Sequence, residues 1–161
     1  MKILFIQTGG SIDKDYPRRT KGWAFEIGEA AAGRILERLD PSFDCEVITC
    51  CRKDSQKISG RDREALAELI MNHPCYRIII THGTDTMLET ARYLDTSISD
   101  KVVVITGAMR PERFSDSDAD INLGTAIGAV QMLKTGIYIS MHGLVRPFAE
   151  MNRDMETGKF H

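Results

Sequence analysis

The sequence predicts an α/β protein, a three-layer α/β/α sandwich whose mostly parallel sheet is covered by helices on both faces. Apolar runs that are each long enough for one buried strand alternate along the chain with stretches that carry apolar residues at helical spacing. Strands and helices in this alternation imply parallel pairing with right-handed crossovers. Because the chain has 161 residues, we expect a single domain over residues 1–161.

Five apolar runs are predicted to form the strands of this sheet, in the manner of a flavodoxin-like or Rossmann-like fold. They are Ile3–Gln7, Cys45–Cys50, Arg77–Thr81, Val102–Thr106 and Ile137–Met141. The stretch Met141–Val145 then reads as a strand, a turn and a further strand.

The four segments between these strands are predicted to be helices, because their apolar residues recur every three or four positions. They are Glu29–Leu39, Ser59–Asn72, Asp85–Asp95 and Ile121–Lys134. Ser59 is a good N-cap for the second helix, and Thr135 with Gly136 is expected to stop the last one. The long polar segment Asp13–Ile27 is expected to be either a flap over a site or a plain surface loop.

Charge and hydropathy exclude several classes of partner. The net charge is −2, and the densest basic cluster, Arg18, Arg19 and Lys21, fits a solvated loop better than a nucleic-acid surface. No run approaches the ~20 apolar residues of a membrane span, and the amino terminus lacks the apolar core of a signal peptide. We therefore expect a cytoplasmic protein without nucleic-acid or membrane partners.

Cysteine usage agrees with that compartment. The four cysteines, Cys45, Cys50, Cys51 and Cys75, include no C-x-x-C pair and lack the usual spacing of zinc ligands. Reduced thiols in a cytosolic protein are the expected state, and no metal is predicted.

The first candidate motif, Thr8–Ile12, follows the first predicted strand. Its glycines permit a tight turn and a close approach of backbone N–H groups to a ligand. The spacing matches neither a phosphate loop nor a dinucleotide fingerprint. Taken alone, Thr-Gly-Gly after a strand is more often a turn than a nucleophile.

The second candidate motif, His82–Thr86, follows the third predicted strand and allows two readings. In the structural one, Thr84 caps a helix and Asp85 lies favourably in its first turn. In the functional one, Asp85 pairs with a ligand ammonium, and Thr84 orients a water or acts as a nucleophile. His82 is a candidate general base, although a histidine at a strand end is more often a structural hydrogen-bonding group.

Two further strand ends carry polar or small residues, Asp54–Lys57 and Thr106–Pro111. Ligands of parallel α/β sheets bind at the carboxyl ends of the strands. Thr8, Thr84 and Asp85 are therefore expected to surround one crevice suited to a small polar molecule.

These strand ends together resemble the L-asparaginase/glutaminase family, the amidohydrolases with two threonine motifs. The matching segments are Thr8–Ile12, Ser55–Gln56, His82–Thr86 and Thr106–Pro111, extended by Asp118, Asn122 and Leu123. Both threonine motifs in this order and at these intervals are highly specific. The resemblance covers nearly the whole chain but only the larger amino-terminal domain of the family, so the carboxyl-terminal domain of longer members is expected to be absent.

The resemblance implies a role for each matching residue. Thr8 is then the nucleophile that attacks the side-chain amide carbon of asparagine, giving an acyl-enzyme and ammonia before water releases aspartate. Thr84 is the second catalytic threonine, and Asp85 is the carboxylate that holds the substrate's α-amino group. Ser55 and Gln56 are then the binders of the substrate's α-carboxylate and amino group, and Gly9, Gly83 and Ala108 contact the substrate mainly through backbone.

The sequence departs from the family pattern at the expected catalytic lysine. Thr125–Val130, on the last predicted helix, contains no lysine, and Lys134 lies too near the end of that helix. Lys14 and Lys57 are candidates that reach the site from loops.

A second departure concerns the tyrosine of the family's flap. Tyr16 is the preferred match, and Phe25 sits at an alternative alignment without a hydroxyl. The polar segment Arg146–His161 is expected to serve assembly, since the family is typically oligomeric, which implies a homodimer or homotetramer.

The main hypothesis is therefore hydrolysis of asparagine without metal or organic cofactor, and the sequence leaves the preference between asparagine and glutamine open. The alternative is a domain that binds asparagine or aspartate and has lost turnover together with the lysine. A third reading, a nucleoside or phosphoribosyl ligand at the glycine loop, lacks the phosphate signature.

Overall fold

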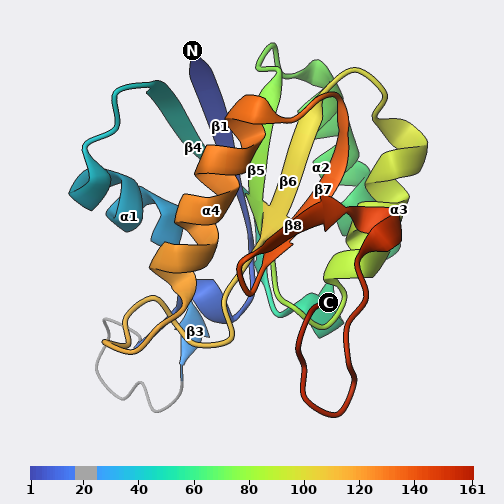
Figure 1. The fold of residues 1–161 in the computed structure, drawn as a ribbon. Coiled ribbons are helices and arrows are strands. Elements are labelled where there is room, and N and C mark those ends of the chain that lie inside the picture. The colour runs from blue at the N-terminus through green and yellow to red at the C-terminus, as the bar shows by residue number, and fades with distance from the viewer. Residues whose placement is uncertain (17–24) are drawn as a thin grey trace.

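A six-stranded sheet with helices on both faces forms the body of the molecule (Figure 1). The computed structural model describes residues 1–16 and 25–161. The strand order is β4-β1-β5-β6-β7-β8, and every neighbouring pair is parallel except β7 with β8. The predicted three-layer, mostly parallel architecture is confirmed.

The predicted strands all form, some with longer bounds. They are β1 (Lys2–Gly9), β4 (Asp44–Lys53), β5 (Arg77–Thr81), β6 (Val102–Thr106), β7 (Gly136–Met141) and β8 (Leu144–Pro147). His142 and Gly143 make the predicted turn between β7 and β8, with φ of 54° and 79°. A two-residue pair, β2 (Lys14–Asp15) with β3 (Glu26–Ile27), lies apart from the main sheet.

The helices are α1 (Ala31–Leu39), α2 (Gly60–Asn72), α3 (Met87–Ser97) and α4 (Ala119–Met132). Short 3₁₀ turns occur at Ser11–Asp13, Ser55–Lys57 and Phe148–Glu150. Ser59 caps α2 as predicted: its hydroxyl accepts from the Asp62 N–H, while the Asp62 carboxylate accepts from the Ser59 N–H.

Most helix boundaries lie one or two residues from the predicted ones, and two of these differences bear on the predicted helix start and stop signals. Helix α3 starts at Met87 rather than at Asp85, because the chain after β5 first passes through a turn. Helix α4 ends at Met132, and Gly136, expected to stop it, is instead the first residue of β7 with φ of 149°.

Alternation along the central strands divides the core into two apolar clusters. In β1, Leu4 and Ile6 face the cluster that contains α2 and α3, whereas Ile3 and Phe5 face the one that contains α1 and α4. The central strands are thus buried on both faces, and their carboxyl ends all point to the lower edge in Figure 1.

The expected flap is only partly described. Its two ends pair as β2 and β3, and Arg18, Arg19 and Lys21 lie outside the described residues.

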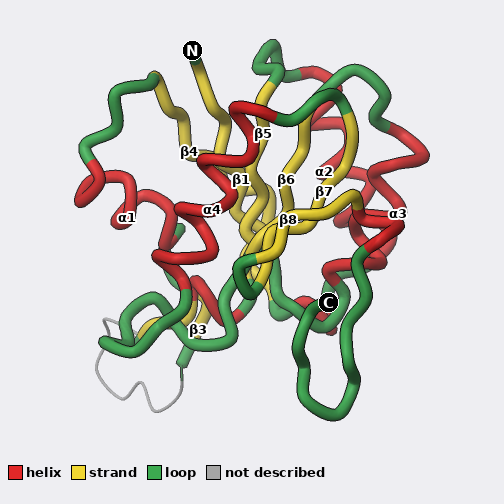
Figure 2. Tube along the Cα trace, viewed as in Figure 1, coloured by secondary structure: helices red, strands yellow, loops and turns green. Residues whose placement is uncertain are grey.

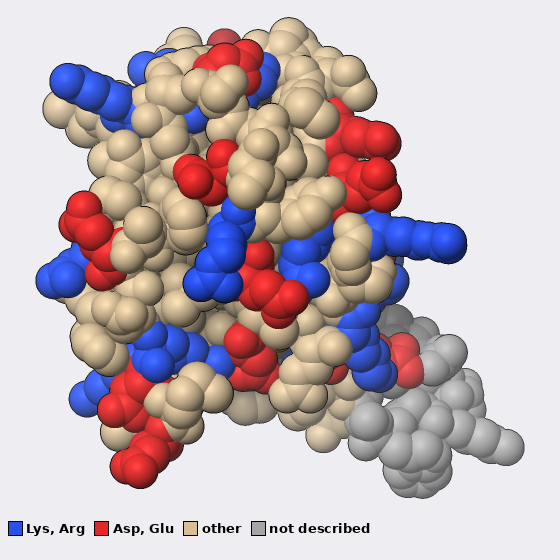
Figure 3. Space-filling view, turned by 90° about the vertical axis from the view of Figure 1, so that its right-hand side faces the viewer, with Lys and Arg blue, Asp and Glu red and all other residues tan. Residues whose placement is uncertain are grey.

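On the face shown in Figure 3, acidic and basic side chains are interspersed rather than gathered by sign. No helix in residues 1–16 and 25–161 has the length and apolar character needed to cross a bilayer. All four cysteines are free.

Candidate active site

The loops that follow β1 and β5 meet backbone to backbone at the carboxyl edge of the sheet. Gly10 has φ of 88°, and a Cβ added there would lie 2.3 Å from the Gly83 nitrogen. A Cβ on Gly83 would lie 2.7 Å from the Ser55 Cβ. Glycine is therefore required at both positions by close approach, and the two predicted motifs together with the Ser55 turn form one structural unit.

A polar cleft of about 390 Å³ opens beside this contact. Its lining comes from the segments after β1, β4, β5 and β6 and from the carboxyl-terminal segment. The lining residues are Ser11, Lys14, Asp54, Ser55, Gln56, Lys57, Gly83, Thr84, Asp85, Met109 and Arg153. Five of the predicted site residues, Ser55, Gln56, Gly83, Thr84 and Asp85, are thus brought together.

Thr84 and Asp85 stand in the turn before α3, not in the helix. The N-cap of α3 is Thr86, whose hydroxyl donates to the Ser55 carbonyl at 2.8 Å rather than capping the helix. The structural reading of Thr84 as a helix cap therefore does not apply. Both side chains are directed by the turn into the cleft lining.

Two donors hold the Asp85 carboxylate. Arg153 Nη1 donates to one oxygen at 2.9 Å, and Gln56 Nε2 donates to the other at 2.8 Å. The hydrogen bonds from Arg153 and then Gln56 lower the pKa of Asp85 below its usual value. The Asp85 carboxylate is therefore ionised at neutral pH and paired with Arg153, and an ionised carboxylate at this position suits a ligand ammonium.

Thr8, Gly9 and Ala108 are not among the lining residues. Strand β1 continues through Gly9, so Thr8 is part of the sheet, and its hydroxyl donates to the Thr81 carbonyl at 2.8 Å. Thr8 and Ala108 are each 1% exposed. Ser11, three residues after Thr8, is the hydroxyl of this motif that reaches the cleft.

Tyr16 is 61% exposed, and its ring contacts that of Phe25 in a tilted arrangement with the ring centroids 4.6 Å apart. Phe25 in turn contacts Phe114 at 5.4 Å. Neither Tyr16 nor Phe25 lines the cleft, although Phe25 lines a neighbouring hollow together with Lys14 and Lys57.

His82 is fully buried, and its Nδ1 lies 2.7 Å from the Gly83 carbonyl while Nε2 lies 2.9 Å from the Thr90 hydroxyl. Since a carbonyl only accepts, Nδ1 donates, and the Thr90 hydroxyl donates to Nε2 while accepting from Arg63 Nε. Burial lowers the pKa of His82 to about 4. The ring is therefore neutral at physiological pH and acts as the structural hydrogen-bonding group of the two predicted alternatives.

Both loop lysines proposed as substitutes lie in the lining. Lys14 pairs with Asp54 at 3.1 Å, and Lys57 lies across from it on the turn after β4. Lys134, in contrast, is exposed and lies between the end of α4 and the start of β7, at the amino edge of the sheet. It is therefore on the opposite side of the molecule from the cleft.

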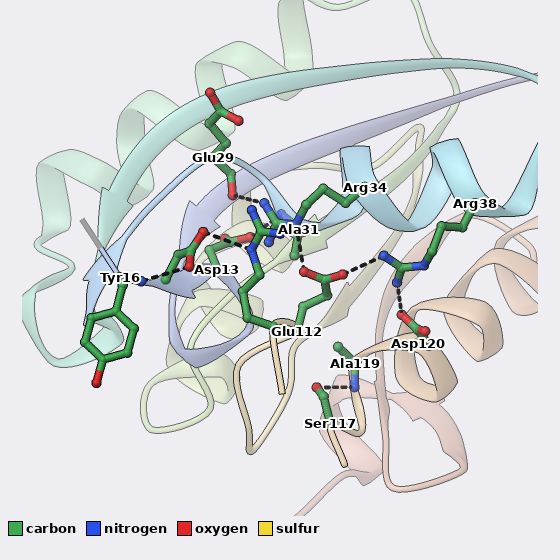
Figure 4. Close-up of polar contacts among 12 residues, drawn as sticks. Asp13, Tyr16, Glu29, Ala31, Arg34, Arg38, Glu112, Ser117, Ala119 and Asp120 are labelled. Carbon is green, nitrogen blue, oxygen red and sulfur yellow. Dashed lines mark hydrogen bonds and ion pairs between the residues drawn. The ribbon is translucent and has the colours of Figure 1, made fainter. Parts of the chain in front are cut away.

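An ionic network fixes the loop that joins β6 to α4 (Figure 4). Glu112 accepts from Arg34 and Arg38 of α1, both at 2.7 Å, and Arg38 also reaches Asp120 at 2.8 Å. Burial would raise the pKa of Glu112, but the bonds from Arg38 and Arg34 outweigh it and lower the pKa. The Glu112 N–H donates to the Ile12 carbonyl at 3.1 Å, which ties this loop to the Ser11 turn.

Asp118 and Asn122, which extended the resemblance, hold the neighbouring backbone. The Asp118 carboxylate accepts from the Met109 and Arg110 N–H groups. Asn122 donates to the Gly107 carbonyl at 3.0 Å and accepts from the His142 N–H at 3.2 Å. Met109 is thereby placed at the rim of the cleft.

Four lining residues have no role in the sequence prediction, namely Ser11, Asp54, Met109 and Arg153. Ser11 lies in the first motif, but the resemblance assigns the reacting hydroxyl of that motif to Thr8. Asp54 and Met109 lie in the loops after β4 and β6. Arg153 lies in the polar segment that is expected to serve assembly, and no local pattern distinguishes it. In the described part of the chain, no group of three or more His, Cys, Asp or Glu side chains is arranged to hold a metal ion.

Comparisons with known proteins agree on one family. A family model described as Asparaginase, N-terminal matches residues 2–155. L-asparaginase 2 of Escherichia coli is 52% identical over 132 residues, which cover 78% of this chain and 37% of that protein. A probable periplasmic L-asparaginase of Haemophilus influenzae is 41% identical over 165 residues, which cover 96% of this chain and 47% of that protein.

A solved structure, the thermostable L-asparaginase from Thermococcus kodakarensis, has a TM-score of 0.84 at 27% identity. The match covers 95% of this chain and 48% of that one. The chain thus spans less than half the length of each of these relatives.

Proposed function

The chain belongs to the asparaginase family, and on that premise we propose that it hydrolyses the side-chain amide of asparagine to aspartate and ammonia. The observation that carries the proposal is that Thr84 and Asp85 both line the cleft. Neither residue belongs to α3, which starts at Met87. A hydroxyl beside a fixed carboxylate suits a substrate that carries an ammonium group next to the reacting amide.

Asp85 and Gln56 are the proposed binders of the α-ammonium. Both lie in the lining, and the Gln56 amide already orients the carboxylate. Ser55, which also lines the cleft, is proposed to bind the α-carboxylate through its hydroxyl. These roles follow the family resemblance at each position.

For the nucleophile, we propose Ser11 in place of Thr8. An attacking hydroxyl must reach the amide carbon, and the Thr8 hydroxyl is buried and donates to Thr81. Ser11 lies in the cleft next to the same glycine turn. Tyr16, which is exposed and outside the cleft lining, remains the proposed flap tyrosine.

The proposed chemistry is acyl transfer in two steps. The Ser11 oxygen bonds to the amide carbon, the C–N bond breaks, and the hydroxyl proton passes by way of Thr84 to the departing nitrogen, which leaves as ammonia. Water then cleaves the ester, releases aspartate and restores the hydroxyl. Lys14 and Lys57 are proposed to stabilise the negative charge that develops on the carbonyl oxygen.

An ammonia-release assay on asparagine and glutamine tests this proposal. Ser11→Ala and Thr84→Ala should each lower kcat by about 10³-fold or more, since only binding and electrostatic contributions would remain. Thr96→Ala, which removes an exposed threonine hydroxyl on α3, serves as the matched control and should keep full activity.

Thr8→Val separates the two nucleophile assignments. It should cost about 1 kcal/mol of stability through the lost hydrogen bond while leaving kcat within a few fold. If Thr8→Val folds but is inactive while Ser11→Ala remains active, Thr8 is the nucleophile. No ammonia from the unmutated protein at millimolar substrate would refute the hydrolase.

The second candidate is a domain that binds asparagine or aspartate without turning it over. It is favoured by the position of Lys134 at the far edge of the sheet, which leaves α4 without a lysine near the cleft. Saturable heat on titration with asparagine, with no product formed, would distinguish it.

We further propose that residues 1–161 fold as one domain and that the protein is cytoplasmic and forms a homodimer or homotetramer. The oligomer is proposed from the family alone, and analytical ultracentrifugation measures it directly. A monomer at micromolar concentration would contradict it.

A further inference from the structure

The carboxyl-terminal segment Met151–His161 folds back as a closed loop beside the carboxyl edge of the sheet (Figure 2). Asn152 and His161 exchange backbone hydrogen bonds at 2.8 and 2.9 Å, and Met151 and Phe160 are each buried to 3% exposure. The Phe160 N–H also donates to His142 Nδ1 at 3.2 Å. The base of the loop is therefore packed into the protein rather than free for assembly.

The loop holds Arg153 in a defined position. Its guanidinium lies 5.7 Å from the centre of the Phe160 ring, and its Nε donates to the Gly158 carbonyl at 3.4 Å. The side chain is 14% exposed, and Nη1 bonds to Asp85 at 2.9 Å. Among the residues that the structure describes, Nη2 has no hydrogen-bond partner.

We propose that Arg153 binds the α-carboxylate of the substrate and makes the cleft selective for α-amino acids over simple amides. This inference rests on the proposed function, because it names the group that recognises the second charge of the same substrate. Asp85 would hold the ammonium, and Arg153 would join Ser55 at the carboxylate, so that the Asp85–Arg153 ion pair opens to receive a zwitterion.

Charge balance supports this reading. The Asp85–Arg153 pair is neutral overall, as is the α-amino acid group, so binding exchanges one ion pair for two without leaving a charge unpaired. A guanidinium also presents parallel N–H donors that match a carboxylate in bidentate geometry. The free Nη2 and the shared Nη1 are the donors available for that contact.

A purely structural role accounts less well for the arrangement. The Asp85 side chain is 44% exposed, and ion pairs at that exposure contribute about 0–1 kcal/mol to stability. The packing of Met151 and Phe160 already holds the loop without this pair. The position of Arg153 in the cleft lining is thus better explained by a ligand.

The test compares two substrates, L-asparagine and L-asparaginamide, which differ in the charge of the α-carboxyl group. Arg153→Gln should raise KM for asparagine by about 10- to 100-fold with kcat changed only a few fold, while KM for asparaginamide stays the same. Lys159→Gln removes one positive charge from the same loop outside the cleft lining and should change neither.

Arg153→Lys keeps the charge without the planar fork and should give an intermediate rise in KM for asparagine alone. If Arg153→Gln does not fold, the comparison of the two substrates is made with Arg153→Lys instead. Equal losses for both substrates, or none for asparagine, would overturn the proposal. So would a lower KM for asparagine in Arg153→Gln, because Arg153 would then compete with the substrate ammonium for Asp85.

If the unmutated protein releases no ammonia, the proposed hydrolysis fails and the recognition is tested by calorimetry. Aspartate should then bind to the unmutated protein and at least 10-fold more weakly to Arg153→Gln. Unchanged aspartate affinity in that variant would overturn the role of Arg153 whether or not the protein is an enzyme.

Discussion

Asp13 is a buried carboxyl whose charge the fold accommodates poorly, and replacing it by asparagine should stabilise the protein at neutral pH. The residue is 0% exposed, and one oxygen accepts from the Ala31 N–H at 2.7 Å, which caps α1 from 18 residues away. The other oxygen has no hydrogen-bond partner, and neither has the nearby buried hydroxyl of Thr81. Burial raises the pKa of Asp13 from 3.8 to about 6, although the bond from Ala31 opposes the shift.

The sign and size of the effect follow from this pKa. Between pH 4 and 6 the folded protein binds more protons at Asp13 than the unfolded chain does, so stability from this group is lost as pH rises through that window. A shift of about 2 units corresponds to about 3 kcal/mol. In Asp13→Asn the amide oxygen still caps α1 and no charge is buried, so this loss should disappear.

Urea unfolding of both proteins from pH 4 to 8 measures the prediction. The stability of Asp13→Asn relative to the unmutated protein should rise by about 3 kcal/mol across this range. Groups such as Asp62, whose pKa the hydrogen bond from Lys53 lowers to about 2, affect both proteins equally and cancel. Asp95→Asn, at an exposed site on α3, should show no such rise. Parallel pH profiles for Asp13→Asn and the unmutated protein would refute the reasoning.

Two further substitutions test the local structure by denaturant unfolding. Ser59→Ala removes the capping box of α2 and should cost about 1 kcal/mol; an unchanged midpoint would show that the box contributes nothing. Gly10→Ala should cost more than about 2 kcal/mol, because the residue has positive φ and its Cβ would meet the Gly83 backbone at 2.3 Å. In contrast, Gly33→Ala in α1, where an added Cβ has open space, should stabilise by up to about 1 kcal/mol, and equal effects at the two glycines would contradict the contact.

The fold was predictable because its signals are local. Each central strand is a continuous apolar run, as expected where both faces are buried, and Ser59 carries its cap within three residues. The predicted bounds are wrong where tertiary contacts override the local helix preference of the residues. Thr84 and Asp85 are good residues for the start of a helix, but contacts of Thr86 with the Ser55 turn delay α3 to Met87.

The site was predictable only as far as the strand ends. Residues that directly follow β4 and β5, such as Gln56 and Asp85, must lie at one edge once the sheet is parallel. Arg153 reaches the same cleft from the carboxyl-terminal segment, and its partner there, Asp85, lies 68 residues away in sequence. The cap that Asp13 gives to Ala31 is equally non-local, so neither contact leaves a signal in the sequence near it.

The position where β1 ends determines which hydroxyl of the first motif lies in the cleft lining, and the proposed nucleophile follows from it. Pairing of β1 with β4 continues to Gly9 opposite Lys53, with a register shift after Gln7, so Thr8 is still held within the sheet. Only after the positive φ angles of Gly9 and Gly10 does the chain leave the ladder, and Ser11 is the first residue with a side chain beyond it. A hydroxyl inside the ladder has a carbonyl as partner, whereas one beyond it faces the cleft. Reactivity should therefore follow strand termination rather than the identity of the first threonine in the motif.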